Sequence, residues 1–264
     1  MNYIAGENNF FMDNITIIRG DDGFGSQLTS IISGIAYCRY HNKKYLHTPI
    51  NNFKLLNKNT SQNYELNRCN ELINKIVLNL GLEMKKNSDS CIIKPFFHNE
   101  IQQDVDNYFS ESFLKELQDS FPEKIKPDYY NKFNIAIHIR RGEDIFESDK
   151  PVRWIESNIY EEIIKKLRIK YPNALFNIFS WGDSGIEKSD DIEFHTSSSG
   201  EKFFEDFVSL VLSDLLVIGS SSFSVAAAMF HSGIVLCDKN IFKISNPVPS
   251  IWFENYRKIM ECNL

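Results

Sequence analysis

The sequence has no long hydrophobic run, and this lack argues against a membrane-spanning protein. No apolar stretch approaches the roughly 20 residues with which a helix crosses a bilayer. The opening segment, MNYIAGENNF, has neither a basic start nor an apolar centre, so it does not resemble a signal peptide. We therefore expect a cytoplasmic protein without a transmembrane segment.

Cysteine is scarce, and positive charge is not in excess. The 5 cysteines show no C-x-x-C spacing, which argues against zinc and against a disulfide framework and fits a reducing compartment. The 29 basic and 35 acidic residues give a net charge of −6, so nucleic acid is not an expected partner. Walker, HExxH, GxSxG and EF-hand patterns are also absent from the sequence. Any anion site must therefore be a local cluster of positive charge.

Strand-like and helix-like segments alternate along the first half of the chain. Residues 14–19 are β-branched and predict a strand, residues 20–25 predict a glycine-rich turn, and residues 26–41 carry apolar side chains at helical spacing, with Ser26 as the expected N-cap. The segments that follow are an extended stretch at 45–48, a helix at 65–80, a strand at 91–97 and a mostly helical stretch at 100–121.

The second half repeats this alternation after a charged stretch with two prolines at 122–132, which we interpret as a linker. Such alternation is typical of parallel sheets with helices on both faces, in which ligands bind outside the carboxyl ends of the strands. We expect an α/β protein with domains at residues 1–125 and 126–264. The predicted strands are 133–139, 174–180, 192–196, 214–219 and 234–237, and the predicted helices are 155–171, 202–213, 223–231 and about 251–262.

The most informative stretch is FNIAIHIRRGED, residues 133–144. A buried-type strand there delivers His138, Arg140 and Arg141 to a turn at its carboxyl end. Guanidinium groups at such a place are costly unless an anion meets them, and their planar fork suits a phosphate or carboxylate. A diphosphate is the simplest partner, and a structural ion pair is the alternative for Arg140.

Three segments, in order, resemble the fucosyltransferase superfamily of α1,2-, α1,6- and protein O-fucosyltransferases. HIRRGED is similar to its HxRRGD-type motif. GDDGFGSQLTSIISGIAYCRYHNKKYL resembles its N-terminal Gly-Phe-Gly-Asn-Gln loop with the helix and strand that follow, although Ser26 replaces the usual Asn. DLLVIGSSSFSVAAAMF resembles its C-terminal hydroxyl-rich turn, and IFSWGDS is a weaker fourth match.

This resemblance implies a GT-B-like fold, in which two Rossmann-like α/β domains face a cleft. It also implies an inverting, metal-independent glycosyltransferase with GDP-fucose as donor substrate and a glycan or other hydroxyl compound as acceptor. Arg140 would stabilise the leaving diphosphate, and Asp22 would be the catalytic base, with Asp21 as a neighbouring contender. The expected donor-binding residues are Gly23, Phe24, Gly25, Ser26, His138, Arg141, Asp183, Ser221, Ser222, Phe223 and Ser224.

Each residue also has a structural interpretation that the sequence leaves open. Arg141 could brace the loop by pairing with Glu143 or Asp144, His138 could be a core histidine, and Asp22 could belong to a solvated turn. The serine turn could simply cap a helix.

The D-x-D match at Asp104 and Asp106 lies in a polar, helix-like stretch rather than at a strand end, so we expect no metal. Two other functions also stay open: transfer from a different nucleotide sugar, and a non-catalytic module that binds a nucleotide or phosphate.

Overall fold

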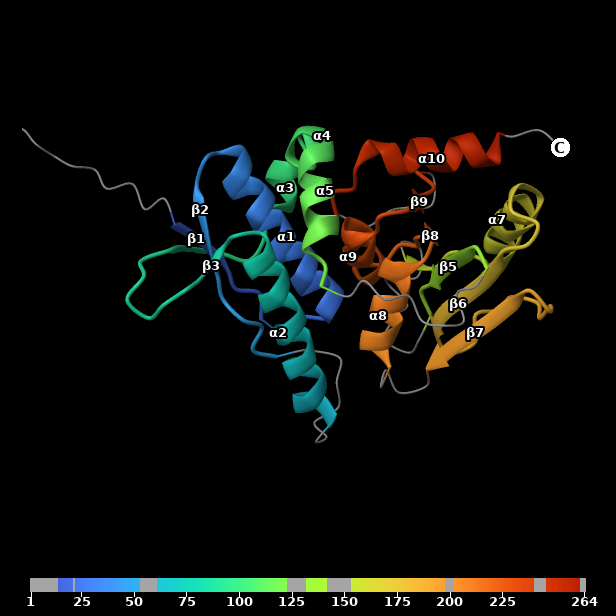
Figure 1. Cartoon of the computed structure of the whole chain (residues 1–264), viewed down its shortest axis with the longest axis horizontal. Coiled ribbons are helices and arrows are strands. Elements are labelled where there is room, and N and C mark those ends of the chain that lie inside the picture. The colour runs from blue at the N-terminus through green and yellow to red at the C-terminus, as the bar shows by residue number, and fades with distance from the viewer. Residues whose placement is uncertain are drawn as a thin grey trace, which may run out of the picture.

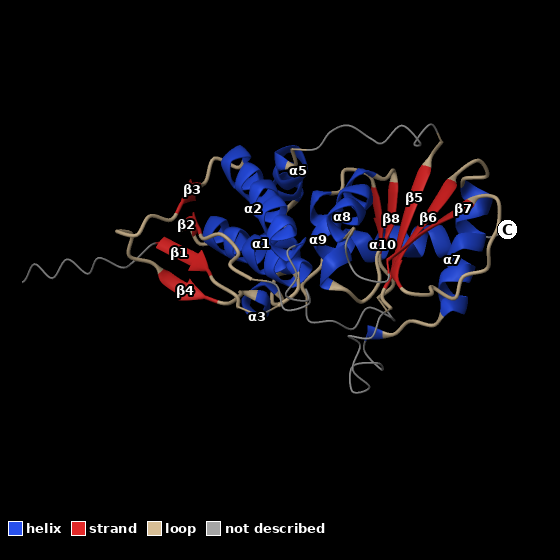
Figure 2. Cartoon of the chain, turned by 90° about the horizontal axis from the view of Figure 1, so that it is seen from below, coloured by secondary structure: helices blue, strands red, loops and turns tan. Residues whose placement is uncertain are grey.

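The computed structural model describes residues 14–20, 22–52, 61–122, 132–141, 153–197, 202–239 and 246–261. Within these residues the chain forms two parallel sheets, with helices between the sheets and on the outer side of the second sheet (Figures 1 and 2). The predicted α/β fold class with two Rossmann-like units is confirmed. No described helix is both long and apolar enough to cross a membrane.

The first sheet has four parallel strands in the order β3-β2-β1-β4. The predicted strand–turn–helix–strand unit is present, but its helix begins earlier, with Gly23 in extended conformation as the N-cap (φ −65°, ψ 157°), so Ser26 lies inside the first turn. The two-residue strand β3 was too short for the sequence pattern to reveal. The elements are β1 (Asn14–Ile17), α1 (Phe24–Tyr40), β2 (Lys44–His47), α2 (Ser61–Asn79), β3 (Glu83–Met84) and β4 (Ile92–Lys94).

The helical stretch predicted at 100–121 is divided into three helices, α3 (His98–Ile101), α4 (Val105–Tyr108) and α5 (Glu111–Ser120). Asp104 leaves helical geometry with φ −153° and ψ 55°, which separates α3 from α4. Ser110 then caps α5 by accepting a hydrogen bond from the Phe113 amide at 3.4 Å. Short polar residues that bond to the nearby backbone often interrupt helices in this way.

The second sheet has five parallel strands in the order β7-β6-β5-β8-β9. All five predicted strands are present, and the helices lie where the periodicity placed them. The elements are β5 (Asn134–Ile139), α7 (Ser157–Lys170), β6 (Leu175–Trp181), β7 (Ile192–Ser197), α8 (Phe203–Leu212), β8 (Leu215–Val217), α9 (Ser222–Phe230), β9 (Ile234–Leu236) and α10 (Ser250–Met260).

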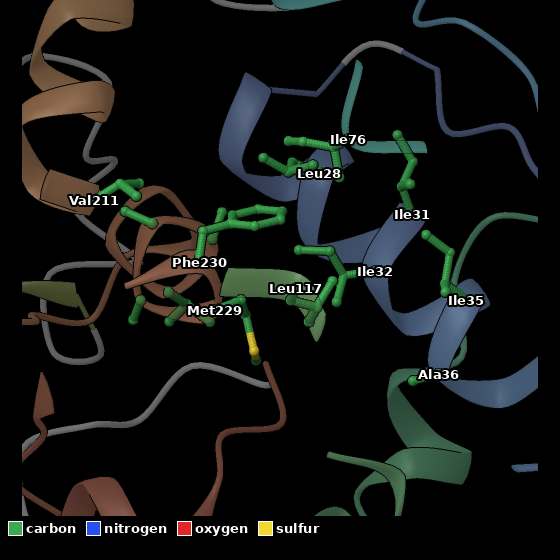
Figure 3. Close-up of a cluster of buried hydrophobic side chains, with 14 of the residues drawn as sticks. Leu28, Ile31, Ile32, Ile35, Ala36, Ile76, Leu117, Val211, Met229 and Phe230 are labelled. Atoms are coloured by element: carbon green, nitrogen blue, oxygen red, sulfur yellow. The ribbon is translucent and has the colours of Figure 1, made fainter. Parts of the chain in front are cut away.

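The two halves share one hydrophobic core. Side chains from α1, α2 and α5 pack with side chains from α8 and α9 in a helical layer between the two sheets (Figure 2). Figure 3 shows Leu28 and Ile32 of α1 beside Leu117 of α5 and Phe230 of α9. A second cluster on the other face of the second sheet is covered by α7 and α10.

The division into domains at residue 125 stays a prediction, because residues 123–131 lie outside the described part of the chain. The predicted cleft is also untested. The residues that follow β5, β7 and β9 in the chain, 142–152, 198–201 and 240–245, lie outside the described part as well.

Candidate active site

Both sheets have a topological switch point, where successive strands begin to be added on the opposite side. In the second sheet this point lies between β5 and β8, and in the first sheet it lies between β1 and β4. Ligands of open parallel sheets bind outside the carboxyl ends of the strands at such points. Arg140 directly follows β5 and the serine turn follows β8, so the two main predicted motifs flank one switch point.

Arg140 is half-buried at the end of β5, two residues after the buried His138. The His138 ring lies 5.5 Å from the ring of Phe223 at the start of α9. Burial, together with the charge of Arg140, lowers the pKa of His138 to about 3, so the imidazole is neutral at physiological pH. Its Nδ1 atom is buried and has no hydrogen-bond partner within the described part of the chain. His138 thus connects the arginine strand to the serine turn.

Arg141 lies in a different environment from its neighbour. It is only 4% exposed, and its guanidinium donates to the Arg140 carbonyl at 2.9 Å, to Ser157 Oγ at 3.0 Å and to the Ser184 carbonyl at 3.3 Å. It also lies over the Trp154 ring at 4.2 Å. Arg141 therefore braces the end of β5 against the start of α7 and the turn after β6. Its predicted partners Glu143 and Asp144 are outside the described residues.

The serine turn caps α9 as well as presenting hydroxyl groups. Ser221 is the N-cap and accepts from the Phe223 amide at 3.3 Å, and the Ser224 hydroxyl donates to the Ser221 carbonyl at 3.1 Å. Ser222 donates to Asn246 Oδ1 at 3.1 Å. A donating hydroxyl keeps its lone pairs, while the amides of the first turn of α9 form the positive end of the helix dipole.

The glycine-rich loop brings the start of α1 against the start of α9. A Cβ atom on Gly25 would lie 2.4 Å from Phe223 Cα and 2.5 Å from the Phe223 amide nitrogen. Gly25 is therefore needed for close packing of two backbones. Phe24 is 5% exposed, and its ring packs 5.1 Å from Phe207, which places it in the core rather than on an open surface. Gly23 needs no special backbone freedom, since its φ is −65°.

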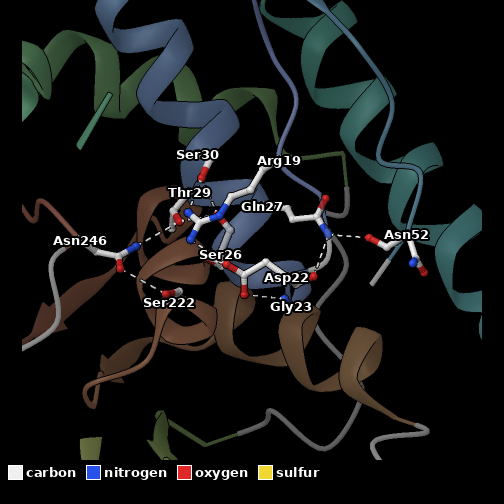
Figure 4. Close-up of polar contacts among 10 residues, drawn as sticks. All are labelled: Arg19, Asp22, Gly23, Ser26, Gln27, Thr29, Ser30, Asn52, Ser222 and Asn246. Carbon is white, nitrogen blue, oxygen red and sulfur yellow. Dashed lines mark hydrogen bonds and ion pairs between the residues drawn. The ribbon is translucent and has the colours of Figure 1, made fainter. Parts of the chain in front are cut away.

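Asp22 is held by three neighbours (Figure 4). Its Oδ1 accepts from the Gly23 amide at 2.8 Å, and its Oδ2 accepts from Ser26 Oγ at 2.8 Å and pairs with Arg19 Nη2 at 2.7 Å. The side chain keeps 35% of its surface exposed. The sequence interpretation missed Arg19, although an arginine at the carboxyl end of a predicted strand is the same kind of signal that drew attention to Arg140.

Asn246 joins the starts of α1 and α9. Its side-chain amide donates to Thr29 Oγ1 at 3.0 Å, and its Oδ1 accepts from Ser222 (Figure 4). The structure thus brings the glycine-rich loop and the serine turn together, as the predicted site requires. Asn246 is the second residue that sequence reasoning missed, and no motif indicated it.

Asp183 lies in the exposed turn after β6, beside Ser184, whose carbonyl accepts from Arg141, and its Oδ1 accepts from the Gly185 amide at 2.9 Å. Asp21 is outside the described residues.

Asp104 and Asp106 lie at the start of α4, and both carboxylates form hydrogen bonds within the protein. Asp104 accepts from Asn107 at 2.9 Å, and Asp106 accepts from the Ser250 amide at 2.8 Å. The described residues include no group of three or more histidine, cysteine or acidic side chains that could hold a metal ion.

Comparison with known proteins identifies the family. The family model for glycosyl transferase family 11 matches residues 29–244. The match begins just after the glycine-rich loop and covers most of the chain. No curated protein shows significant similarity.

Two solved structures are distant likenesses. NodZ α-1,6-fucosyltransferase co-crystallised with GDP has a TM-score of 0.41 at 12% identity, covering 81% of this chain and 91% of that one. Fucosyltransferase NodZ from Bradyrhizobium has a TM-score of 0.37 at 12% identity, covering 81% and 92%. On the evidence of the family match, the chain belongs to glycosyl transferase family 11 and is a glycosyltransferase, which confirms the resemblance to the fucosyltransferase superfamily.

Proposed function

We propose that this glycosyltransferase transfers fucose from GDP-fucose to a glycan or other hydroxyl acceptor, with inversion at the anomeric carbon and without a metal ion. The observation that carries the proposal is the position of Arg140 at the end of β5, at the switch point that it shares with the serine turn. A guanidinium and a helix N-terminus at one place favour an anion such as a diphosphate.

The chemistry asked of Arg140 is stabilisation of charge on the leaving group. Negative charge builds on the diphosphate as the bond to the sugar breaks, so a guanidinium fixed in advance stabilises the transition state more than the ground state. The bracing contact from Arg141 to the Arg140 carbonyl, at 2.9 Å, supports such a fixed position. We assign Arg141 to positioning on this basis.

Asp22 is the proposed base that takes the proton of the acceptor hydroxyl. An inverting transfer needs the base on the face of the sugar opposite the diphosphate, and Asp22 comes from the other half of the chain than Arg140. Both carboxylate oxygens already accept hydrogen bonds, so an acceptor hydroxyl would share or replace one of them. The 35% exposure of the side chain leaves room for that approach.

The remaining donor contacts follow from position. The first amides of α9 would donate to the phosphate oxygens, and so would the Ser222 hydroxyl on exchanging its bond to Asn246 Oδ1. The buried Ser224, in contrast, would hold the turn through its bond to the Ser221 carbonyl. Asp183 would accept from the guanine base, as the resemblance implies. Metal independence is supported by Asp104 and Asp106, whose carboxylates are bonded to Asn107 and to the Ser250 amide rather than placed at a strand end.

The first test is Arg140→Ala, assayed by sugar transfer from GDP-fucose, GDP-mannose and UDP-sugars. We expect wild-type turnover with GDP-fucose and a fall in kcat of more than about 100-fold in the variant, as for loss of a transition-state charge partner. Arg168→Ala is the matched control. Arg168 belongs to α7, in the same half of the chain as Arg140, and forms an ion pair with Asp191 at 2.7 Å. Near-normal turnover in Arg140→Ala would contradict the mechanism, and selective use of a UDP-sugar would contradict the donor.

Inversion and metal independence need their own measurements. Nuclear magnetic resonance of the product should show the anomeric configuration opposite to that of the donor. Activity should survive a chelator. Asp22→Asn should lower kcat by about 100-fold or more, within the usual range for loss of a general base.

A further inference from the structure

We infer that Arg19 is a positioning residue that holds the Asp22 carboxylate in place for proton abstraction. This inference rests on the proposed role of Asp22 as the base. Arg19 lies two residues after β1, at the switch point of the first sheet, and lies over the ring of Phe96, which follows β4 on the other side of that point.

The guanidinium of Arg19 connects the loop to the helix. Nη2 pairs with Asp22 Oδ2 at 2.7 Å, and Nη1 donates to Ser30 Oγ at 2.9 Å (Figure 4). Ser30 in turn donates to the Ser26 carbonyl at 2.8 Å. The Phe96 ring supports the guanidinium at 5.3 Å from the ring centroid. Both terminal nitrogens of the guanidinium therefore have a defined partner, and the Phe96 ring lies against its plane.

Such an arrangement restricts Asp22 more than its own segment would. Two of its three side-chain contacts, from the Gly23 amide and Ser26 Oγ, come from its own segment, and Arg19 adds a charged contact from the residues after β1. The Arg19 side chain is 24% exposed, and a rigid guanidinium fork loses little freedom when it forms two bonds. Because catalysis depends on near-attack geometry, a displacement of about 1 Å can cost on the order of 10²-fold in rate.

The first experiment compares Arg19→Gln and Arg19→Lys with wild type for kcat, KM and the dissociation constant of GDP. We expect kcat to fall about 10- to 100-fold in Arg19→Gln, with GDP affinity changed by less than about 2-fold, because the carboxylate loses its orientation while the donor contacts remain. Arg19→Lys keeps the charge and can form one bond to Asp22, so it should recover part of kcat.

Arg39→Gln is the matched control. Arg39 lies in the last turn of α1, pairs with Glu116 and lies over the Phe113 ring at 4.9 Å. Like Arg19, it therefore contacts one carboxylate and one phenylalanine ring, but at the end of α1 away from Asp22. We expect this variant to lose thermal stability to a similar extent and to keep its kcat. Ser30→Ala, which removes the second anchor of Arg19 together with the bond from Ser30 to the Ser26 carbonyl, should lower kcat in the same direction by a smaller factor.

A double-mutant comparison separates this inference from the proposed function. If Arg19 acts through Asp22, Arg19→Gln should have little further effect in an Asp22→Asn background, because residues that act as a unit are not additive. Full activity in Asp22→Asn would refute the proposed base itself. Loss of activity in Asp22→Asn with unchanged kcat in Arg19→Gln would refute the positioning role alone.

Two further results would also overturn the inference. Weaker GDP binding with unchanged kcat in Arg19→Gln would make Arg19 a donor ligand. Equal kcat loss in Arg19→Gln and Arg39→Gln would make it merely structural. Should Arg19→Gln fail to fold, Arg19→Lys and Ser30→Ala answer the question, and normal kcat in both would reject the positioning role.

Discussion

At the scale of single residues, two adjacent arginines have separate surroundings. Arg140 is half-buried at the end of β5, whereas Arg141 is 4% exposed and contacts Ser157, Ser184 and Trp154. The period of two in a strand predicts that neighbours point to opposite sides. The partners of Arg141 could not be predicted, because they come from segments that only the fold brings together.

Stability measurements should distinguish the two arginines. We expect Arg141→Ala to lower the free energy of unfolding by about 2–4 kcal/mol, because it removes three hydrogen bonds of a buried guanidinium and a cation–π contact. Arg140→Ala should change it by less than about 1 kcal/mol, a common size for a half-buried substitution. Urea unfolding followed by circular dichroism measures both. The reverse order of the two effects would show that Arg140 is the structural arginine.

At the scale of elements, the starts of α1 and α9 form the centre of the candidate site. The sequence pattern located both helices to within about two residues, because strand, turn and helix signals were each local, but it placed the start of α1 at Ser26 rather than at Phe24. It did not predict that Gly25 lies against the Phe223 backbone, because it assigned Gly25 to donor binding rather than to helix packing. Contact between helices about 200 residues apart leaves no trace in local spacing.

Gly25→Ala tests the contact between these helices. Alanine favours an isolated helix over glycine by about 1 kcal/mol, but its Cβ would lie 2.4 Å from a backbone atom that cannot rotate away. We expect a loss of about 3 kcal/mol or more in the free energy of unfolding, at the upper end for overpacking. Gly20→Ala is the control, since nothing lies within 4 Å of its added Cβ. A Gly25→Ala protein as stable as wild type would show that the two helices separate easily.

At the scale of the whole molecule, the two sheets are joined by one helical core rather than by separate cores. The alternation of strands and helices predicted the α/β class, with helices on both faces of a parallel sheet. The run from Val225 to Phe230 in α9 is buried throughout, on every side of the helix. A helix that is apolar all round packs on more than one face, so this joint could have been predicted from the sequence.

Four histidines are buried in this fold, His47, His98, His138 and His231, and burial lowers the pKa of the first three enough to make stability depend on pH. His47, His98 and His138 are 0%, 6% and 8% exposed. Burial lowers the pKa of His47 and of His98 to about 4, and burial with the charge of Arg140 lowers that of His138 to about 3. Asp206 acts in the opposite sense, because burial raises its pKa to about 7.

The sign of the pH effect follows from proton binding. Below about pH 6.5 the unfolded chain protonates its histidines while the folded chain does not, so histidine-linked stability is complete above that pH and is lost as the pH falls toward 4. Each unit of pKa difference is worth about 1.4 kcal/mol. Protonation of Asp206 returns part of this loss, which leaves a net decrease on the order of 3 kcal/mol between pH 7.5 and 5.

Urea unfolding at a series of pH values measures this dependence, and one substitution assigns it. His47→Gln removes one histidine contribution of about 2 kcal/mol, so the net acid-induced decrease of about 3 kcal/mol should shrink by more than half. His41, which is exposed and bonds the Tyr108 hydroxyl at 2.9 Å, provides the control, and His41→Gln should leave the slope unchanged. Stability that rises on acidification would mean that Asp206 outweighs the histidines. A slope equally reduced by both substitutions would mean that burial of His47 is not its cause.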